Sequence, residues 1–362
     1  GFARKRRYLR HITNKQHITN NQMYRSGFLA MLLLCVSLSA GAEQYYFKHF
    51  DTGDGLPSNT VLCMTEDSYG FMWFGTKDGA CRYDGKRFSR IGPMGTVCAM
   101  CADREGHVWL SSILGMWCMD LNTSSQEKID IGVNRPVFEM RIDEDGFIWM
   151  VSDGNILRLD TKTHDVVRYP KETYFPAVKI CVDDNGDVWF SSYDGCVKRY
   201  NKDSDDFTSL RVLSDNDIRA GKTLKFISGI DGERLLLATE QNDVLRVNHV
   251  SGEVEFLFRG NEDNVNALVM GMLVDSYDNY LVVTDRGLYI FNDSFEKYKY
   301  LTANPTDEFS LSNDNLRCIS KDSAGRIWIG TFYSGLNLYN PSKVIFYREN
   351  SEQPGTSIHG ST

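Results

Sequence analysis

The chain has 362 residues, 42% of them apolar and 12% aromatic, and a formal net charge of −8. Residues 1–42 hold seven basic and no acidic side chains, so the remainder is more acidic than the whole. An acidic surface repels phosphate backbones, which argues against nucleic acid as a partner. Many short β-rich runs, without a long amphipathic helical pattern, predict an all-β globular fold.

Residues 1–42 have the organisation of a secretory signal peptide. A basic and polar stretch precedes the apolar run 28–40, and Ala-Gly-Ala at 40–42 has the small-x-small pattern of a cleavage site. The chain starts with Gly, and Met23 would open a more ordinary leader, so we interpret residues 1–22 as lying upstream of the true start. The alternative is an uncleaved membrane anchor, for which the apolar run is short.

A ten-residue skeleton recurs through the rest of the chain. Its first copy runs from Asp67 to Thr76, with Gly70 and Trp73 three and six residues after the Asp. Asp and Gly favour tight turns and the flanking apolar runs favour strands, so each copy predicts a β-hairpin. We interpret the Asp and Gly as turn-formers and the Trp as a core residue. The other intact copies contain Trp109, Trp149, Trp189 and Trp328.

Two further copies are degenerate. At 275–284, Leu281 replaces the Trp, and around Gly232 only the apolar core and the final Thr239 remain. A repeat of about 40–45 residues is typical of a propeller blade with four strands. The sequence therefore predicts a seven-bladed β-propeller of four-stranded antiparallel blades over residues 43–349.

The two ends of this region lack a complete repeat. Residues 45–50 alternate weakly and have no blade of their own. We expect them to pair with the last blade and close the ring, which removes two exposed sheet edges. Residues 350–362 are similar to 304–313, the stretch before the last repeat, so we interpret them as the start of a following, truncated unit.

Two motifs indicate a family. Trp-Phe-Gly-Thr-x-x-Gly at 73–79 and Trp-Ile-Gly-Thr-x-x-x-Gly-Leu-x-x-Tyr at 328–339 resemble the regulator-propeller repeats of Bacteroides-type hybrid two-component histidine kinases. The segments 55–59 and 310–313 also look like that family. The resemblance implies a periplasmic sensor region of an inner-membrane protein, attached to the membrane through downstream sequence and working as a homodimer. It also implies detection of an oligosaccharide and control of polysaccharide-utilisation genes by a downstream kinase.

A binding site is predicted on one rim of the ring. The loop before each inner strand and the loop after each repeat Thr or Ser should share a face, and aromatic side chains beside charged ones suit an oligosaccharide. The first choices are Arg135, Tyr193, Arg286 and Tyr333, followed by Tyr174 and Lys77. The same rim should carry Asn59, Asp78, Phe175, Asp194, Lys222, Asn264, Asp285, Asn315 and Phe332.

The sequence offers no constellation for catalysis. Its histidines are scattered without the spacing of a metal site or a triad, and most acidic residues are explained by hairpin turns. We therefore expect no enzymatic activity, cofactor or metal for this stretch. The alternatives are an exported polysaccharide lyase or glycoside hydrolase, since propellers host such chemistry, or a protein-interaction scaffold.

Eight cysteines follow the signal peptide, and their pairing is left open. The Cys-x-x-Cys spacing at 98–101 is that of redox motifs, but these residues fall on a predicted inner strand rather than at a helix start. A role in thiol exchange is therefore not expected.

Overall fold

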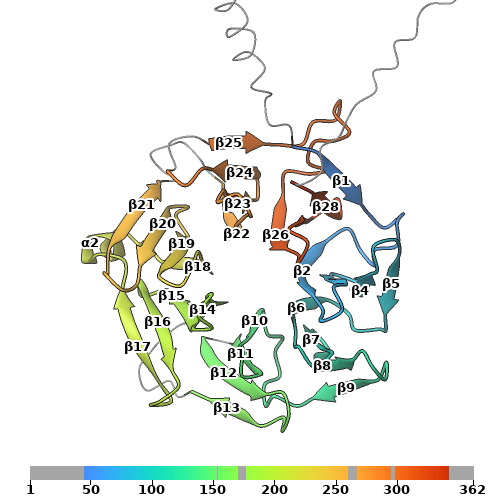
Figure 1. Cartoon of the computed structure of the whole chain (residues 1–362), viewed down its shortest axis with the longest axis horizontal. Coiled ribbons are helices and arrows are strands. Elements are labelled where there is room, and N and C mark those ends of the chain that lie inside the picture. The colour runs from blue at the N-terminus through green and yellow to red at the C-terminus, as the bar shows by residue number, and fades with distance from the viewer. Residues whose placement is uncertain (1–44, 153, 170–176, 260–266, 295–297, 342–362) are drawn as a thin grey trace, which may run out of the picture. The chain divides into compact units, whose positions relative to one another are not determined.

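The computed structural model describes residues 45–152, 154–169, 177–259, 267–294 and 298–341. They form seven four-stranded antiparallel sheets arranged as blades around a central axis (Figure 1). The predicted seven-bladed propeller is confirmed. The predicted signal peptide, the truncated unit at 350–362 and Tyr174 lie outside the described residues, as do Phe175 and Asn264.

Each blade is built from strands that follow one another in the chain, from the axis outward. Blades 1 to 3 consist of β2 (Val61–Glu66), β3 (Met72–Thr76), β4 (Gly79–Tyr83) and β5 (Phe88–Ile91); β6 (Val97–Ala102), β7 (His107–Ser112), β8 (Gly115–Asp120) and β9 (Gln126–Ile129); β10 (Glu139–Ile142), β11 (Phe147–Ser152), β12 (Asn155–Asp160) and β13 (Val166–Arg168).

A short helix, α2 (Asp215–Arg219), lies between blades 4 and 5 in the chain. Blades 4 to 7 consist of β14 (Ala177–Val182), β15 (Val188–Ser192), β16 (Cys196–Asn201) and β17 (Asp206–Arg211); β18 (Leu224–Gly229), β19 (Arg234–Thr239), β20 (Val244–Asn248) and β21 (Val254–Phe258); β22 (Val269–Val274), β23 (Tyr280–Thr284), β24 (Gly287–Phe291) and β25 (Tyr298–Leu301); β26 (Leu316–Lys321), β27 (Ile327–Thr331) and β28 (Leu336–Tyr339), completed by β1 (Phe47–Phe50).

The repeat Asp is a buried hydrogen-bond acceptor. In blade 1, Asp67 Oδ1 accepts the backbone N–H groups of Tyr69 and Phe71, both at 3.0 Å, and Oδ2 accepts the indole Nε1–H of Trp73 at 2.7 Å. Gly70 takes the positive φ of 82° that the turn requires. The turn-forming role is confirmed, and the indole bond adds a link between turn and core. The same bond measures 3.1, 2.7, 2.9 and 2.8 Å for Trp109, Trp149, Trp189 and Trp328.

The two degenerate repeats still make complete blades. In blade 6, Asn279 Nδ2 donates to Asp275 Oδ2 at 3.0 Å and so replaces the missing indole. In blade 5 the turn is held one residue later, since Asp231 Oδ1 accepts the backbone N–H groups of Glu233 and Arg234 at 2.9 and 2.8 Å. The turn and the core positions therefore survive the loss of the Trp.

The ring is closed by the strand nearest the start of the described chain. β1 pairs antiparallel with β28, with Phe47 opposite Tyr339 and Phe50 opposite Leu336, as expected. A second link joins blades 1 and 7 directly, because Glu66 accepts the N–H and the hydroxyl of Ser323 at 2.7 and 2.6 Å.

Glycine on the second strand makes room for a larger residue on the first. Gly75 stands opposite Cys63 in the register, and a Cβ on Gly75 would lie 2.4 Å from Cys63 Sγ. Gly330 and Cys318 repeat this arrangement in blade 7, where the distance would be 2.5 Å.

We expect Gly75→Ala to destabilise the protein by about 1–3 kcal/mol, the usual cost of overpacking a core. Cys63→Ala removes the opposing sulfur but leaves Val97 Cγ1 at 2.8 Å from the added methyl group, so the double variant should regain part of the loss in a urea denaturation series. Equal losses in the single and double variants would show that the Cys63 sulfur is not what the added methyl group meets.

Candidate functional site

All seven inner strands begin at one end of the ring, called here the mouth face. These strands, β2, β6, β10, β14, β18, β22 and β26, pack around the axis (Figure 1). In blade 1 the N–H of Lys77, after the second strand, donates to the carbonyl of Thr60, before the first, at 3.1 Å. Equivalent bonds occur in blades 2, 5, 6 and 7, so these two loops share the mouth face as predicted. The Asp turns lie at the other end, the hairpin face.

The described residues of the predicted site are exposed around the mouth face, but they do not converge on one point. The exposed fractions of Tyr193 and Tyr333 are 43% and 62%, and Lys77, Arg135 and Arg286 are also exposed. Arg135 lines a separate cavity of about 480 Å³ between blades 2 and 3. The ring of Tyr333 packs edge-on against Phe332, with centroids 4.8 Å apart.

One residue of the wider predicted rim is committed to the fold. Lys222 Nζ lies 2.7 Å from Asp243 Oδ2 and 3.3 Å from Asp217 Oδ1, and its side chain is largely covered. Asp217 in turn caps α2 through Ser214. Lys222 is therefore a structural residue rather than a ligand contact.

Exposed apolar side chains gather on the mouth face. Phe138 and Leu268 were not anticipated, and they are 67% and 45% exposed. Both flank the start of an inner strand, one directly after and one directly before its first buried residue. Together with the exposed tyrosines they give this face a broken apolar surface, made by Ile113, Leu114, Phe138, Tyr193, Leu268 and Tyr333.

The axis of the ring holds a cavity of about 570 Å³, lined by all seven inner strands. Most of its side chains are small, apolar or sulfur-bearing. The charged residues on its wall are Glu66, Glu139, Arg141, Lys179, Asp184, Arg317 and Lys321. The thiols and thioethers on its wall are those of Cys63, Cys98, Cys101, Cys181 and Cys318 and of Met64, Met100, Met140, Met270 and Met272.

Six of the seven inner strands have an irregular register at their start, on the mouth face. The register shifts immediately after the first inner-strand residue in blades 1, 2, 4, 5, 6 and 7. In these six blades the first residue is buried, whereas the next residue is only partly buried. In blade 3 the buried Val137 and the exposed Phe138 take the equivalent places directly before β10. These next residues, called here the collar, are Leu62, Cys98, Phe138, Val178, Lys225, Met270 and Arg317.

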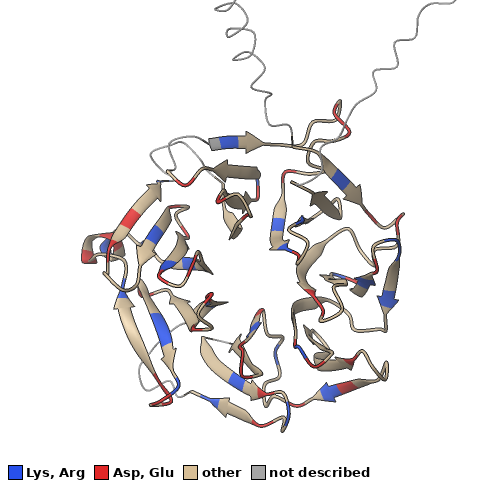
Figure 2. Cartoon of the chain, in the orientation of Figure 1, with Lys and Arg blue, Asp and Glu red and all other residues tan. Residues whose placement is uncertain are grey.

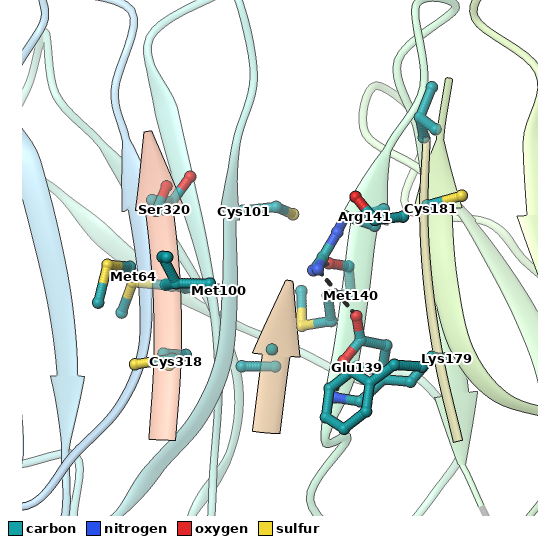
Figure 3. A pocket seen from close by; sticks show the side chains of 18 of the residues that line it. Met64, Met100, Cys101, Glu139, Met140, Arg141, Lys179, Cys181, Cys318 and Ser320 are labelled. Carbon is teal, nitrogen blue, oxygen red and sulfur yellow. Dashed lines mark hydrogen bonds and ion pairs between the residues drawn. The ribbon is translucent and has the colours of Figure 1, made fainter. Parts of the chain in front are cut away.

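Below the collar, a buried carboxylate joins two cations across blades 3 and 4. Glu139 Oε2 lies 2.5 Å from Lys179 Nζ, and Oε1 lies 3.0 Å from Arg141 Nη2 (Figure 3). The contact with Arg141 lacks the angle of a hydrogen bond, so it is an ion pair only. Glu139 and Lys179 occupy the same place in their strands where Cys63 and Cys318 stand in blades 1 and 7.

Lys225 and Arg317 bring two more cations to the collar. No described carboxylate forms an ion pair with either one, although Arg317 lies over the ring of Phe332 at 5.1 Å and Lys225 over that of Phe226 at 5.9 Å. Partial burial lowers the pKa of Lys225. The charges of Lys179 and Arg317 lower it further, whereas those of Glu240 and Asp285 raise it. The collar therefore concentrates positive charge without complete compensation.

The cavity thiols are poor nucleophiles. All eight described cysteines are free thiols, which answers the question of pairing for this part of the chain. Burial raises the pKa of Cys101 to about 12 and also raises that of Cys98. Both lie on β6, so the Cys-x-x-Cys spacing is structural, and its thiols stay protonated at neutral pH.

Histidine does not contribute to the cavity wall as described. His49 contacts the carbonyl of Ser310 at 2.7 Å, His107 contacts Asp103 at 2.9 Å, and His249 packs on Trp189. Among the described residues, no three His, Cys, Asp or Glu side chains are grouped to hold a metal ion. The described part of the chain also has no helix with the length and hydropathy of a membrane span.

Residues 55–78 and 310–333 match the family profile called the two-component regulator propeller. These stretches contain the segments before β2 and β26 and most of the first hairpins of blades 1 and 7. The chain therefore carries regulator-propeller repeats, and the resemblance expected from the sequence is confirmed.

Solved structures share the fold. The extracellular domain of a proposed one-component system from B. thetaiotaomicron superposes with a TM-score of 0.70 at 16% identity, covering 82% of this chain and 40% of that one. A proposed hybrid two-component system from the same organism gives 0.66 at 18%, covering 83% and 42%. Virginiamycin B lyase from Staphylococcus aureus gives 0.65 at 12%, covering 82% of this chain and 99% of the lyase.

A histidine kinase named P4 from Formosa agariphila is 38% identical over 55 residues, which is 15% of this chain and 4% of the kinase. The chain thus spans less than half of the extracellular domains it matches and a small part of that kinase.

Proposed function

We propose that this propeller is the ligand-sensing module of an extracytoplasmic two-component sensor and that it binds an oligosaccharide at the mouth face. The observation that carries the proposal is the apolar and aromatic surface of the mouth face, on which Tyr193 and Tyr333 are exposed and whose Phe138 lines the axial cavity of about 570 Å³. Aromatic faces stack on the C–H surfaces of sugars, and neighbouring charged groups bind hydroxyls or carboxylates. The regulator-propeller repeats support a sensory role for the module.

Ligand binding in such a sensor controls a downstream kinase, and the genes under its control serve the use of the parent polysaccharide. Membrane attachment and dimerisation belong to this proposal through the same resemblance. The alternative of a propeller lyase has a structural neighbour in virginiamycin B lyase, of which a variant with one histidine changed to alanine is catalytically inactive. No described histidine lines the axial cavity here.

Tyr193→Ala and Tyr333→Ala should each weaken oligosaccharide binding by about tenfold, because each removes an exposed aromatic face from the site. Isothermal titration calorimetry against a panel of oligosaccharides measures the affinity, and chromatography of the same mixtures detects products. Tyr277→Ala is the matched control, since Tyr277 is 60% exposed but lies in a turn on the hairpin face. Equal losses in all three variants, or turnover of the sugar, would contradict the proposal.

A further inference from the structure

We propose that the collar is an anion site and that the oligosaccharide it takes is an acidic one, bearing carboxylate or sulfate groups. This inference rests on the proposed function and adds the substrate class. Its core is Lys225 and Arg317, two cations at the same position of blades 5 and 7, and Lys179 lies one position further along the inner strand of blade 4. Basic segments on the inner strands β18 and β26 are visible in Figure 2.

These cations are not required by the fold. The collar residue of the other blades is Leu62, Cys98, Phe138, Val178 or Met270, so the repeat accepts apolar side chains there. The residue before it is buried in every blade and provides the packing. Arg317 lines the axial cavity, and Lys225 holds the equivalent position of blade 5, next to the cavity-lining Phe226. A cation at such a position, where other blades have an apolar side chain, is better explained by a ligand than by stability.

The local field around the collar is unfavourable until an anion binds. Glu139 is occupied by Lys179 and Arg141, and its side chain is only 7% exposed, so it cannot also serve Lys225 or Arg317. Glu240 and Asp285 act on Lys225 only at longer range than an ion pair. Asp285 is further engaged, since its Oδ1 accepts the N–H of Leu268 at 2.7 Å.

The surroundings suit an acidic sugar better than a free ion. Phe226 lies 5.2 Å from Lys179 Nζ and 5.9 Å from Lys225 Nζ, and Phe332 lies 5.1 Å from Arg317. Lys225 and Arg317 have no carboxylate partner among the described residues, so the ring beside each offers a surface for stacking while the cation offers a charge for the carboxylate or sulfate of one ligand. The chain as a whole is acidic, so the basic collar is a local exception in its charge. An acidic ligand must therefore be small enough to reach the collar without contacting the acidic surface.

The test titrates the purified protein with trigalacturonate, a sulfated heparin tetrasaccharide, neutral cellotetraose and inorganic sulfate. We expect at least one acidic oligosaccharide to bind, with an affinity that falls as salt rises, and cellotetraose to bind at least tenfold more weakly. Lys225→Gln and Arg317→Gln should each weaken acidic binding about tenfold. The control is Lys321→Gln. Lys321 lies on the same strand as Arg317 and on the wall of the same cavity, but at the end near the hairpin face, where Lys321 Nζ donates to the carbonyl of Val274 at 3.1 Å.

A readout without ligand accompanies the titration. Lys225→Met should raise the Tm by about 1–3 °C, because it removes a partly desolvated charge that Lys179 and Arg317 repel, whereas Lys321→Met should not. A lowered Tm for Lys225→Met would make Lys225 a structural residue and overturn the inference.

The binding outcomes separate the two proposals. Equal affinity for neutral and acidic sugars, unchanged in the collar variants, would overturn the acidic site and leave the oligosaccharide sensor standing. Sulfate alone binding as tightly as the oligosaccharides would assign the collar to a free anion and overturn the inference. If none of the sugars binds at millimolar concentration, both proposals fail.

Discussion

Asp183→Ala should destabilise the propeller by about 3–5 kcal/mol, the largest effect expected of any single side chain in the hairpins. Asp183 is buried and accepts three hydrogen bonds: the backbone N–H groups of Asn185 and Asp187 at 3.0 and 2.9 Å and the indole N–H of Trp189 at 2.9 Å. Removing the carboxylate leaves three donors unsatisfied at the end of the blade core. Urea denaturation followed by tryptophan fluorescence measures the loss.

Asp184→Ala is the matched control because Asp184 is the exposed neighbour of Asp183 in the same turn. It should change the free energy of unfolding by less than about 0.5 kcal/mol, as is usual for surface positions. Asp183→Asn should fall between the two, since its oxygen can still accept the backbone N–H groups while its amide opposes the indole N–H. A similar stability for Asp183→Ala and Asp184→Ala would refute the role given to the repeat Asp.

Phe50→Ala should lower the free energy of unfolding by about 3–5 kcal/mol, because it leaves a cavity at the seam, the junction of blades 1 and 7 where the ring closes. Phe50 is 5% exposed and packs among three rings, with centroids 5.3 Å from Tyr83, 5.5 Å from Phe88 and 5.9 Å from Trp328. These rings belong to blades 1 and 7, so one side chain joins the two ends of the circle. Hydrogen exchange should show the largest loss of protection in blades 1 and 7.

The control for the seam is Lys48→Ala on the same strand. Lys48 is exposed, and its ammonium lies 4.6 Å from the ring of Phe50, a contact worth about 0.5–1 kcal/mol at such sites. A uniform loss of protection over all seven blades in Phe50→Ala would mean that opening is global and does not begin at the seam.

The fold could be predicted because each copy of the repeat keeps the interactions of the turn as well as the residue types. The turn of blade 1 needs an acceptor for its backbone N–H groups, a residue with positive φ and a donor to the second carboxylate oxygen. These are Asp67, Gly70 and Trp73, and every intact copy has the same three residue types. The replacement of the indole by Asn279 in blade 6 could not be predicted, because the sequence does not say which side chain reaches the free oxygen of Asp275.

The sequence predicted the loop residues of the candidate site but not the charged residues on its inner strands. Loop geometry follows from strand order, so the placement of Lys77, Tyr193, Arg286 and Tyr333 on one face could be derived. Glu139, Lys179 and Lys225 lie on inner strands, where the sequence was expected to supply core. The available signal was a charged residue at a position where the other repeats have an apolar one. Aligning the inner strands of the seven blades would have revealed it. Whether any of these residues binds a ligand remains a prediction.

Ring closure by β1 also dictates an order of events during folding. Residues 47–50 pair with residues 336–339, so the first strand of the circle finds its partner only after the other six blades have been synthesised. Contacts this distant in sequence form slowly, since a long loop must be closed before they give any stabilisation. Until then, the edge of β28 and the apolar face of β1 are both unprotected. A chaperone that covers either one should therefore affect the yield of native protein more than the rate at which its hairpins form.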